Sequence, residues 1–179
     1  SLTKNGGSVL YLDGTNTYTG LTTAAGGYVV ARNSSALGAG TGGGGAGTVV
    51  LDGATLQLEN NISVTDEDVT ITGNGVGGTR GAFASYSGNN SWGGDITMAG
   101  DSMLYANTGT GTITGVVGDG GSGFEVTKTG NGSITFGGST SNTYTGDTNV
   151  HAVVLNLGKT GGAVDVPGDV NLGNGPSGQ

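Results

Sequence analysis

Near its start the chain reads Leu2-Thr3-Lys4-Asn5-Gly6-Gly7-Ser8, then a short apolar run, then Asn16-Thr17-Tyr18-Thr19-Gly20. The same order returns as Val126-Thr127-Lys128-Thr129-Gly130-Asn131-Gly132-Ser133 and then Asn142-Thr143-Tyr144-Thr145-Gly146. The two tyrosines are 126 residues apart, which corresponds to six units of about 21 residues. A repeat of about twenty residues is typical of a solenoid, in which each turn packs only on its neighbours.

Composition narrows the class of protein further. Glycine supplies 42 of the 179 residues, but there is no strict Gly-x-y period and only two prolines, which excludes collagen. Hydrophobic residues reach 33%, and many are β-branched residues in alternation with polar ones, a pattern that disordered chains rarely show. We therefore expect a folded chain rich in β-strands.

Charge and cysteine content exclude several functions. The sequence has no cysteine, so it can form neither disulfides nor thiolate metal sites. The net charge is −8, and the five basic residues are scattered, so no basic stripe could follow a phosphate backbone or an anionic membrane. No apolar run approaches the roughly 18 residues of a membrane helix. The chain starts at Ser1 without a recognisable signal peptide, and we expect it to be a segment of a larger protein.

Short segments with a period of two run along the whole chain, each closed by Gly, Asn or Asp. The clearest predicted strands are residues 8–12, 27–31, 48–51, 55–58, 62–64, 69–72, 95–98, 111–117, 124–127, 133–136, 152–157 and 169–172. Loops are predicted at 38–47, 73–81 and 118–123. No charge block or linker marks a boundary, so we predict one domain of about eight turns, roughly 40 Å long.

Alternation also predicts which side chains point into the narrow core. The predicted inward pairs are Val49 and Leu51, Leu56 and Leu58, Ile62 and Val64, Val69 and Ile71, Ile96 and Met98, Ile134 and Phe136, Val153 and Leu155, and Val170 and Leu172. The Thr, Asn and Ser residues between them are expected to face outward. The repeated residues Tyr18 and Tyr144, and likewise Lys4 and Lys128, are expected at equivalent positions about six turns apart.

Residues 2–38 and 126–175 resemble the autotransporter passenger-associated β-strand repeat, with residues 39–125 joining the two copies. The resemblance rests on the Thr-Lys start, the Tyr-Thr-Gly turn, and the endings Asn33-Ser34-Ser35-Ala36-Leu37-Gly38 and Val166-Pro167-Gly168-Asp169-Val170-Asn171-Leu172-Gly173-Asn174-Gly175. The segment 87–97 resembles the stretch that commonly joins such repeats. The resemblance implies an all-β, right-handed parallel β-helix on the outer surface of a Gram-negative-type bacterium. The second copy departs from the pattern at Val150-His151-Ala152, where the first copy has Gly26 and Gly27.

The residues that could support catalysis are few. His151 is the sole histidine, and it directly precedes a predicted strand. No stretch resembles a nucleophile elbow, and a lone histidine beside a strand is typical of a surface position. We predict no catalytic residues. A β-helix polysaccharide lyase or hydrolase remains the alternative, because sequence cannot show whether two carboxylates face one another.

Metal and cofactor binding has one weak candidate. Asp66, Glu67 and Asp68 form the chain's one acidic cluster, between two predicted strands. Such a cluster is typical of a solvated turn, in which the side chains hydrogen-bond to their own backbone. The alternative is a weak calcium site, because adjacent carboxylate oxygens are suitable ligands for calcium. The segment 120–126 resembles a calcium-binding nonapeptide repeat with Glu125 in place of Asp, but these repeats bind calcium only in tandem, so a loop is the better interpretation. We otherwise predict no cofactor.

Two patterns would suit a binding surface. Alternating threonines at 108, 110, 112 and 114 could order water, as in ice-binding solenoids, but the row is not repeated in neighbouring predicted strands, so ordinary outward β-branched residues explain it better. Trp92 and the six tyrosines could stack on sugar rings, but tyrosines at fixed repeat positions more commonly pack at a corner with the hydroxyl outward.

These observations predict a structural or adhesive segment, a β-helical stalk or fibre of a secreted or cell-surface protein without catalysis. Alternatives are the carbohydrate-active enzyme and a sugar-binding or ice-binding solenoid. The expected partner is a second copy joined end to end, or a longer parent chain that continues the coil, because bare strand edges at the ends of a solenoid need cover. Surface carbohydrate is a further candidate partner, and nucleic acid is not.

Overall fold

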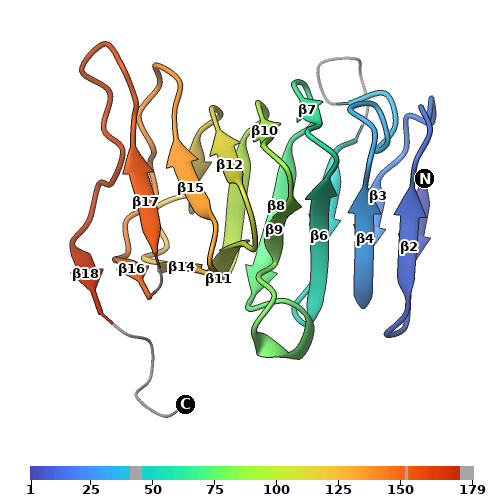
Figure 1. Cartoon of the computed structure of the whole chain (residues 1–179), viewed down its shortest axis with the longest axis horizontal. Helices are drawn as coiled ribbons and strands as arrows, with labels where there is room; N and C mark the ends of the chain where they lie inside the picture. The colour runs from blue at the N-terminus through green and yellow to red at the C-terminus, as the bar shows by residue number, and fades with distance from the viewer. Residues whose placement is uncertain (41–45, 152, 174–179) are drawn as a thin grey trace.

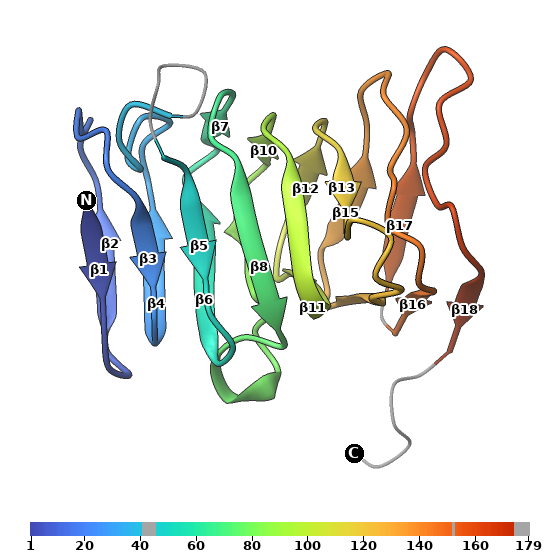
Figure 2. The same ribbon diagram turned by 180° about the vertical axis from the view of Figure 1, so that it is seen from behind.

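The computed structural model describes residues 1–40, 46–151 and 153–173, and in this part the chain is a coil of short parallel strands (Figure 1). In the N-terminal half of the coil, the strands on the near side in Figure 1 run upward and those on the near side in Figure 2 run downward. The coil advances from the N-terminal end to the C-terminal end with a right-handed sense. Predictions for residues 41–45, for 152 at the start of a predicted strand, and for 174–175 lie outside the described residues.

The strands stack in three ladders in which all pairings are parallel. The first ladder contains β1 (Leu2–Lys4), β3 (Thr22–Ala24), β5 (Thr48–Val50), β8 (Val69–Gly73), the first part of β11 (Ile96–Ala106) and β13 (Val117–Gly118). The second contains β2 (Val9–Leu12), β4 (Gly27–Ala31), β6 (Ala54–Glu59), β9 (Phe83–Ser87), the second part of β11, β14 (Val126–Thr129), β16 (Thr148–Val150) and β18 (Val170–Leu172). The third contains β7 (Ser63–Val64), β10 (Asn90–Trp92), β12 (Thr110–Ile113), β15 (Ser133–Phe136) and β17 (Val154–Leu157).

The second ladder has eight strands, so the coil has about eight turns, which confirms the predicted all-β solenoid. The long strand β11 belongs to two ladders, because its first residues pair with β8 and its last residues pair with β9. One 3₁₀ turn, η1 (Val76–Gly78), lies in the loop predicted at 73–81.

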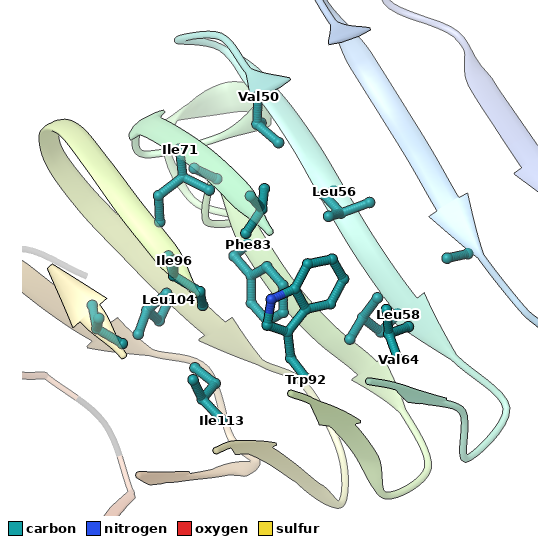
Figure 3. Close-up of a cluster of buried hydrophobic side chains, with 14 of the residues drawn as sticks. Val50, Leu56, Leu58, Val64, Ile71, Phe83, Trp92, Ile96, Leu104 and Ile113 are labelled. Atoms are coloured by element: carbon teal, nitrogen blue, oxygen red, sulfur yellow. The ribbon is translucent and has the colours of Figure 1, made fainter. Parts of the chain in front are cut away.

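A single hydrophobic core of buried side chains runs from Ala24 to Tyr144, and Figure 3 shows its central part. The core contains most of the predicted inward side chains, namely Leu56, Leu58, Ile62, Val64, Val69, Ile71, Ile96, Met98, Ile134 and Phe136. Its centre holds Trp92, whose ring meets that of Phe83 edge to face at 5.3 Å between centroids. Each turn therefore buries its apolar side chains against the turns before and after it.

The predicted inward pair Val49 and Leu51 is wrong by one residue. Val50 is fully buried, whereas Val49 is half-buried and Leu51 is 45% exposed. The strand points its other inward side chain, Thr48, at the buried carboxylate of Glu67. Because the polar residue Thr48 points into the coil, the inward positions of this strand are Thr48 and Val50, which the pattern of apolar residues alone could not reveal.

The inward pairs predicted at the C-terminal end are also wrong. Val153 and Val170 are exposed, Leu172 is 78% exposed, and Leu155 is only half-buried. These residues belong to the last described turns, where β17 and β18 each pair with one strand only. Their side chains lack a following turn to pack against.

The two copies of the repeated stretch are not in register along the ladders, which corrects the expected match of Lys4 with Lys128. Lys4 lies in the first ladder and pairs with Ala24, whereas Lys128 lies in the second ladder and pairs with Leu104. The turns between them are unequal in length, since some pairings join residues 21 apart and others join residues 28 apart. The second copy consequently begins one ladder further around the coil.

The copies also differ at the bend that leads into their fourth strand, β4 in the first copy and β17 in the second. Gly27 has φ +66°, and a Cβ atom there would overlap the carbonyl oxygen of Ser8. The residue 126 positions later is Val153, which has φ +50°, a conformation that β-branched residues rarely adopt. The second copy therefore keeps the left-handed backbone conformation without a glycine, which would adopt it without strain.

Truncation of a core residue should destabilise the coil far more than truncation of its surface neighbour. We expect Leu56→Ala to lower the free energy of unfolding by about 2–5 kcal/mol, because it leaves a cavity between turns. Leu51→Ala, close by in sequence but exposed, should lower it by less than about 1 kcal/mol. Urea unfolding followed by circular dichroism measures both, and equal losses would contradict the assigned alternation.

The two left-handed bends should respond in opposite ways to substitution. Gly27→Ala should lower the free energy of unfolding by more than about 1 kcal/mol, because the methyl group meets backbone atoms and the conformation is strained. Val153→Gly should raise it by up to about 1 kcal/mol, since the side chain is exposed and the strain disappears. Thermal and urea unfolding of both variants tests this, and a destabilised Val153→Gly would count against it.

Candidate functional site

The two lysines of the repeated stretch hydrogen-bond to backbone carbonyl groups at the bends of the coil. The Lys4 ammonium donates hydrogen bonds to the carbonyl oxygens of Gly6 and Gly26 at 2.7 and 3.1 Å. The ammonium of Lys128, which is fully buried, donates to the carbonyl oxygen of Gly132 at 2.6 Å. Burial lowers the pKa of Lys128 to about 8. These lysines therefore serve the fold, because they satisfy carbonyl groups that the glycine turns leave unpaired.

The tyrosines of the repeated stretch have a similar role. The hydroxyl of Tyr18 lies 2.8 Å from that of Thr22, and the hydroxyl of Tyr144 lies 2.6 Å from that of Thr148. Tyr144 is fully buried, and this burial raises its pKa to about 12. The expected outward hydroxyl is therefore wrong for Tyr144. The tyrosine–threonine contact therefore recurs in both copies, although Thr22 lies in the first ladder and Thr148 in the second.

The acidic cluster does not gather into a metal site. Glu67 is buried rather than solvated, and its carboxylate accepts a hydrogen bond from the Thr48 hydroxyl at 2.6 Å. Burial raises the pKa of Glu67, and the neighbouring charges of Asp66 and Asp68 raise it further, against the effect of Thr48. The Asp68 carboxylate accepts the backbone N–H of Asp95 at 2.8 Å. Within residues 1–40, 46–151 and 153–173 no three acidic or histidine side chains could hold one ion, so calcium binding stays a prediction without a converging ligand set.

The structure places the two aromatic candidates differently, with His151 half-buried and Trp92 fully buried. His151 is half-buried, its backbone N–H donates to the carbonyl oxygen of Lys128 at 3.0 Å, and its imidazole bonds to no other described residue. Trp92 is fully buried, so it cannot stack on a sugar ring as the sequence had suggested. Its indole N–H has no acceptor among the described residues.

The threonine row does not continue from turn to turn. Thr112 pairs with Ser91 on one side and with Thr135 on the other, and Thr110 pairs with Ser133. The outer side of the third ladder is thus a mixed polar surface. A regular grid of threonine methyl and hydroxyl groups, which ice binding would require, is not formed by its described strands.

The glycine-rich loop at 118–123 is organised by a carboxylate that the sequence analysis did not select. Asp119 is buried, and it accepts hydrogen bonds from the backbone N–H groups of Gly121, Gly123, Phe124 and Thr145 and from the Thr145 hydroxyl, at 2.8–3.1 Å. Burial alone would raise the pKa of Asp119, but these hydrogen bonds lower it to about 2. The signal available in the sequence was an aspartate directly before a glycine cluster.

Loss of the Asp119 charge should therefore destabilise the fold in acid. The folded-state pKa of about 2 lies below the ordinary value of 3.8, so the stabilisation is present above pH 3.8 and disappears as the pH falls through 2. We expect Asp119→Asn to cost about 1–3 kcal/mol at pH 7 and to flatten the fall in stability between those pH values. Asp13→Asn, at an exposed carboxylate, is the control for urea unfolding at several pH values. A variant with the parent's acid profile would contradict this role.

A groove of about 180 Å³ lies on the outer side of the second ladder, over β2, β4 and β6, which form the near side at the N-terminal end in Figure 1. We call it the tyrosine groove, and it is lined by Val9, Tyr11, Tyr28, Val30, Gln57, Glu59, Arg80 and Tyr86. With Arg32 and Tyr105, which contact its lining, this face gathers four of the six tyrosines and both arginines. The sequence analysis did not select this cluster.

The floor of the tyrosine groove is fixed by a network of hydrogen bonds. The Arg32 guanidinium stacks on the Tyr11 ring at 3.8 Å and donates to the Glu59 carboxylate at 2.8 Å. The other oxygen of Glu59 accepts the Gln57 amide at 2.6 Å. Glu59 and Gln57 are only 9% and 7% exposed. The groove is thus a preformed surface with aromatic and polar groups held in place.

The second candidate surface is the open C-terminal end of the core. A hollow of about 330 Å³ lies there, lined by Val150, Val153, Val154, Leu155, Leu157, Val170 and Leu172. Leu157 and Leu172 are more than half exposed. An apolar cluster of this kind marks an interaction site in a soluble protein.

Comparison of the chain with protein-family models, with curated proteins and with solved structures gave no match in any of the three. The resemblance to the passenger-associated repeat therefore rests on the quoted residues alone. In the described part of the chain no helix has the length and apolar character needed to cross a membrane.

Proposed function

We propose that this chain is a structural and adhesive β-solenoid segment, a stalk or fibre element that assembles end to end. The observation that supports this best is the open C-terminal end, where an otherwise continuous core finishes in bare leucine and valine side chains. Burying such side chains against a further turn is favourable by about 25 cal/mol for each Å² of apolar surface.

The proposed occupant of the open end is the N-terminal end of a second copy. The second ladder ends with β18, in which Leu172 pairs with Val150, and it begins with β2, in which the half-buried Leu10 pairs with Val29. Among the described residues each of these end strands pairs on one side only, which leaves its other backbone edge for a further strand. Stacking β18 of one copy on β2 of the next would extend the ladder by strand addition and cover both leucines.

The proposed setting is the outer surface of a Gram-negative-type cell, in a secreted or surface-anchored parent protein. The support is the resemblance of the two repeated stretches to autotransporter passenger repeats, whose Lys and Tyr residues serve the fold in both copies. In a longer parent, further turns of the coil could occupy the same ends. Adhesion would then use the side surfaces of the rod.

We propose a binding function in preference to hydrolysis or elimination at the tyrosine groove. Glu59 is the one carboxylate that lines it, and that carboxylate is engaged by both Arg32 and Gln57. A glycoside hydrolase uses two carboxylates on opposite sides of the scissile bond. The groove therefore supports recognition of a ligand better than it supports chemistry on one.

The end-to-end contact can be tested by placing charge in it. We expect the parent chain to form elongated oligomers and the double variant Leu157→Lys/Leu172→Lys to sediment as a monomer, because buried lysines would face an apolar partner surface. Sedimentation velocity and electron microscopy at increasing protein concentration provide the measurement.

Val164→Lys is the matched control, because Val164 is 46% exposed but lies outside the hollow. It should assemble like the parent chain. A parent chain that stays monomeric at the highest soluble concentration would refute end-to-end assembly, and so would a double variant that assembles normally.

A further inference from the structure

Arg80 is the cation of the tyrosine groove without a carboxylate partner. Its guanidinium lies 5.5 Å from the Tyr86 ring centroid and 5.8 Å from that of Tyr105, and the Tyr86 side chain hydrogen-bonds to it. Among the described residues no acidic side chain lies within 4.0 Å of it. An arginine held by neutral rings keeps its planar donor groups available for an anion.

Arg32 shows the contrast on the same face. Its guanidinium contacts the carboxylates of Glu59 at 2.8 Å and Asp13 at 3.8 Å. Its charge is therefore compensated within the protein. In a chain of net charge −8, Arg80 forms an isolated positive point on the outer side of the second ladder.

A buried amide in the groove also has an unused acceptor. Gln57 is 7% exposed and donates through its amide nitrogen to Glu59, while its amide oxygen accepts no hydrogen bond from the described residues. This oxygen is not among the buried unpaired atoms of the described residues, so it is accessible from the groove. It is well suited to accept a hydrogen bond from a hydroxyl group.

The tyrosines supply flat apolar surfaces beside these polar groups. Tyr28 is half-buried and Tyr11 is 49% exposed, so each ring keeps part of a face toward solvent. Tyr28 pairs with Val9 and Thr55 across the ladder, and Tyr11 pairs with Val30. The two tyrosines therefore lie on adjacent strands, about 4.8 Å apart, and are offset by two residues along them, so they are diagonal neighbours on this face.

We propose that the tyrosine groove binds an oligosaccharide that contains a hexuronic acid. The sugar rings lie on Tyr11 and Tyr28, a hydroxyl group donates to Gln57, and the carboxylate pairs with Arg80. The groove shares β2 with the proposed end-to-end contact, through Val9 and Tyr11, but none of its residues lines the hollow at the C-terminal end, where Leu157 and Leu172 lie.

The shape and charge of the groove favour this ligand class over others. Its volume of about 180 Å³ is below the usual range for enclosed small-molecule pockets, so it suits one or two rings of a longer chain. The net charge of −8 and the single free arginine oppose a polyphosphate backbone. Aromatic rings beside fixed hydrogen-bonding groups match the alternating apolar and hydroxylated surfaces of a sugar.

The test uses the whole chain and two probes, trigalacturonate and its fully methyl-esterified form, in isothermal titration calorimetry at low salt. We expect saturable binding of the acid, and affinity at least roughly tenfold weaker for the ester, because a bidentate arginine–carboxylate pair is lost. A hyaluronan tetrasaccharide, which carries glucuronate, serves as a second acidic probe with another linkage.

Arg80→Gln should weaken binding of the acid to the level of the ester, and Arg80→Lys should restore it only in part, because lysine lacks the planar fork. Thr97→Ala, at an exposed residue of the first ladder, should bind like the parent chain. Absence of saturable binding of both acidic probes up to about 10 mM would overturn the proposal. Equal affinity for acid and ester would do the same, and that comparison needs no variant.

Discussion

The structure depends on the register in which each turn of backbone lies on the turn before it. Parallel ladders place residues such as Val50, Ile71 and Met98 directly above one another, and all three are buried. Backbone hydrogen bonds between turns and apolar contacts within the coil therefore form together or not at all. Loop length can vary between turns because loops project outward and leave this register unchanged, which explains why turns of 21 and 28 residues coexist.

The narrow core contains few polar side chains, and several of these hydrogen-bond to backbone groups at the bends between strands. Asn90 is buried and links its own turn to the preceding one, since its amide nitrogen donates to the Ser85 hydroxyl at 2.9 Å and its amide oxygen accepts the Ile62 backbone N–H at 3.0 Å. Lys128 and Asp119 act in the same way on glycine turns, one with carbonyl groups and the other with N–H groups. Buried polar side chains with partners are thus part of the scaffold.

The class of fold could be predicted because it follows from local alternation and from a repeat length, both of which are written in the sequence. Whether an individual side chain points into the coil or outward could be predicted less well. Leu51 was misassigned because Thr48 is held inward by Glu67, a contact between residues 19 apart. Strands β9 and β10 are rich in Ala, Ser and Asn, and their extended form depends on neighbouring strands. Tyr28 and Tyr86 line the same groove because β4, β6 and β9 stack in one ladder, so residues far apart in the chain meet there and no sequence motif marks it.

The bare last turn has a consequence for how stability is distributed along the rod. Strands β17 and β18 are held from one side, whereas β8, β9 and β11 are enclosed by turns on both sides. Unfolding the last described turn exposes little additional apolar surface, because much of that surface is already exposed. Each turn closer to the centre exposes more. Amide hydrogens should accordingly exchange with solvent first in the end strands, β1 and β2 at one end and β16 to β18 at the other, and only through global unfolding at the centre, so the rod is a series of units that fray inward from both ends.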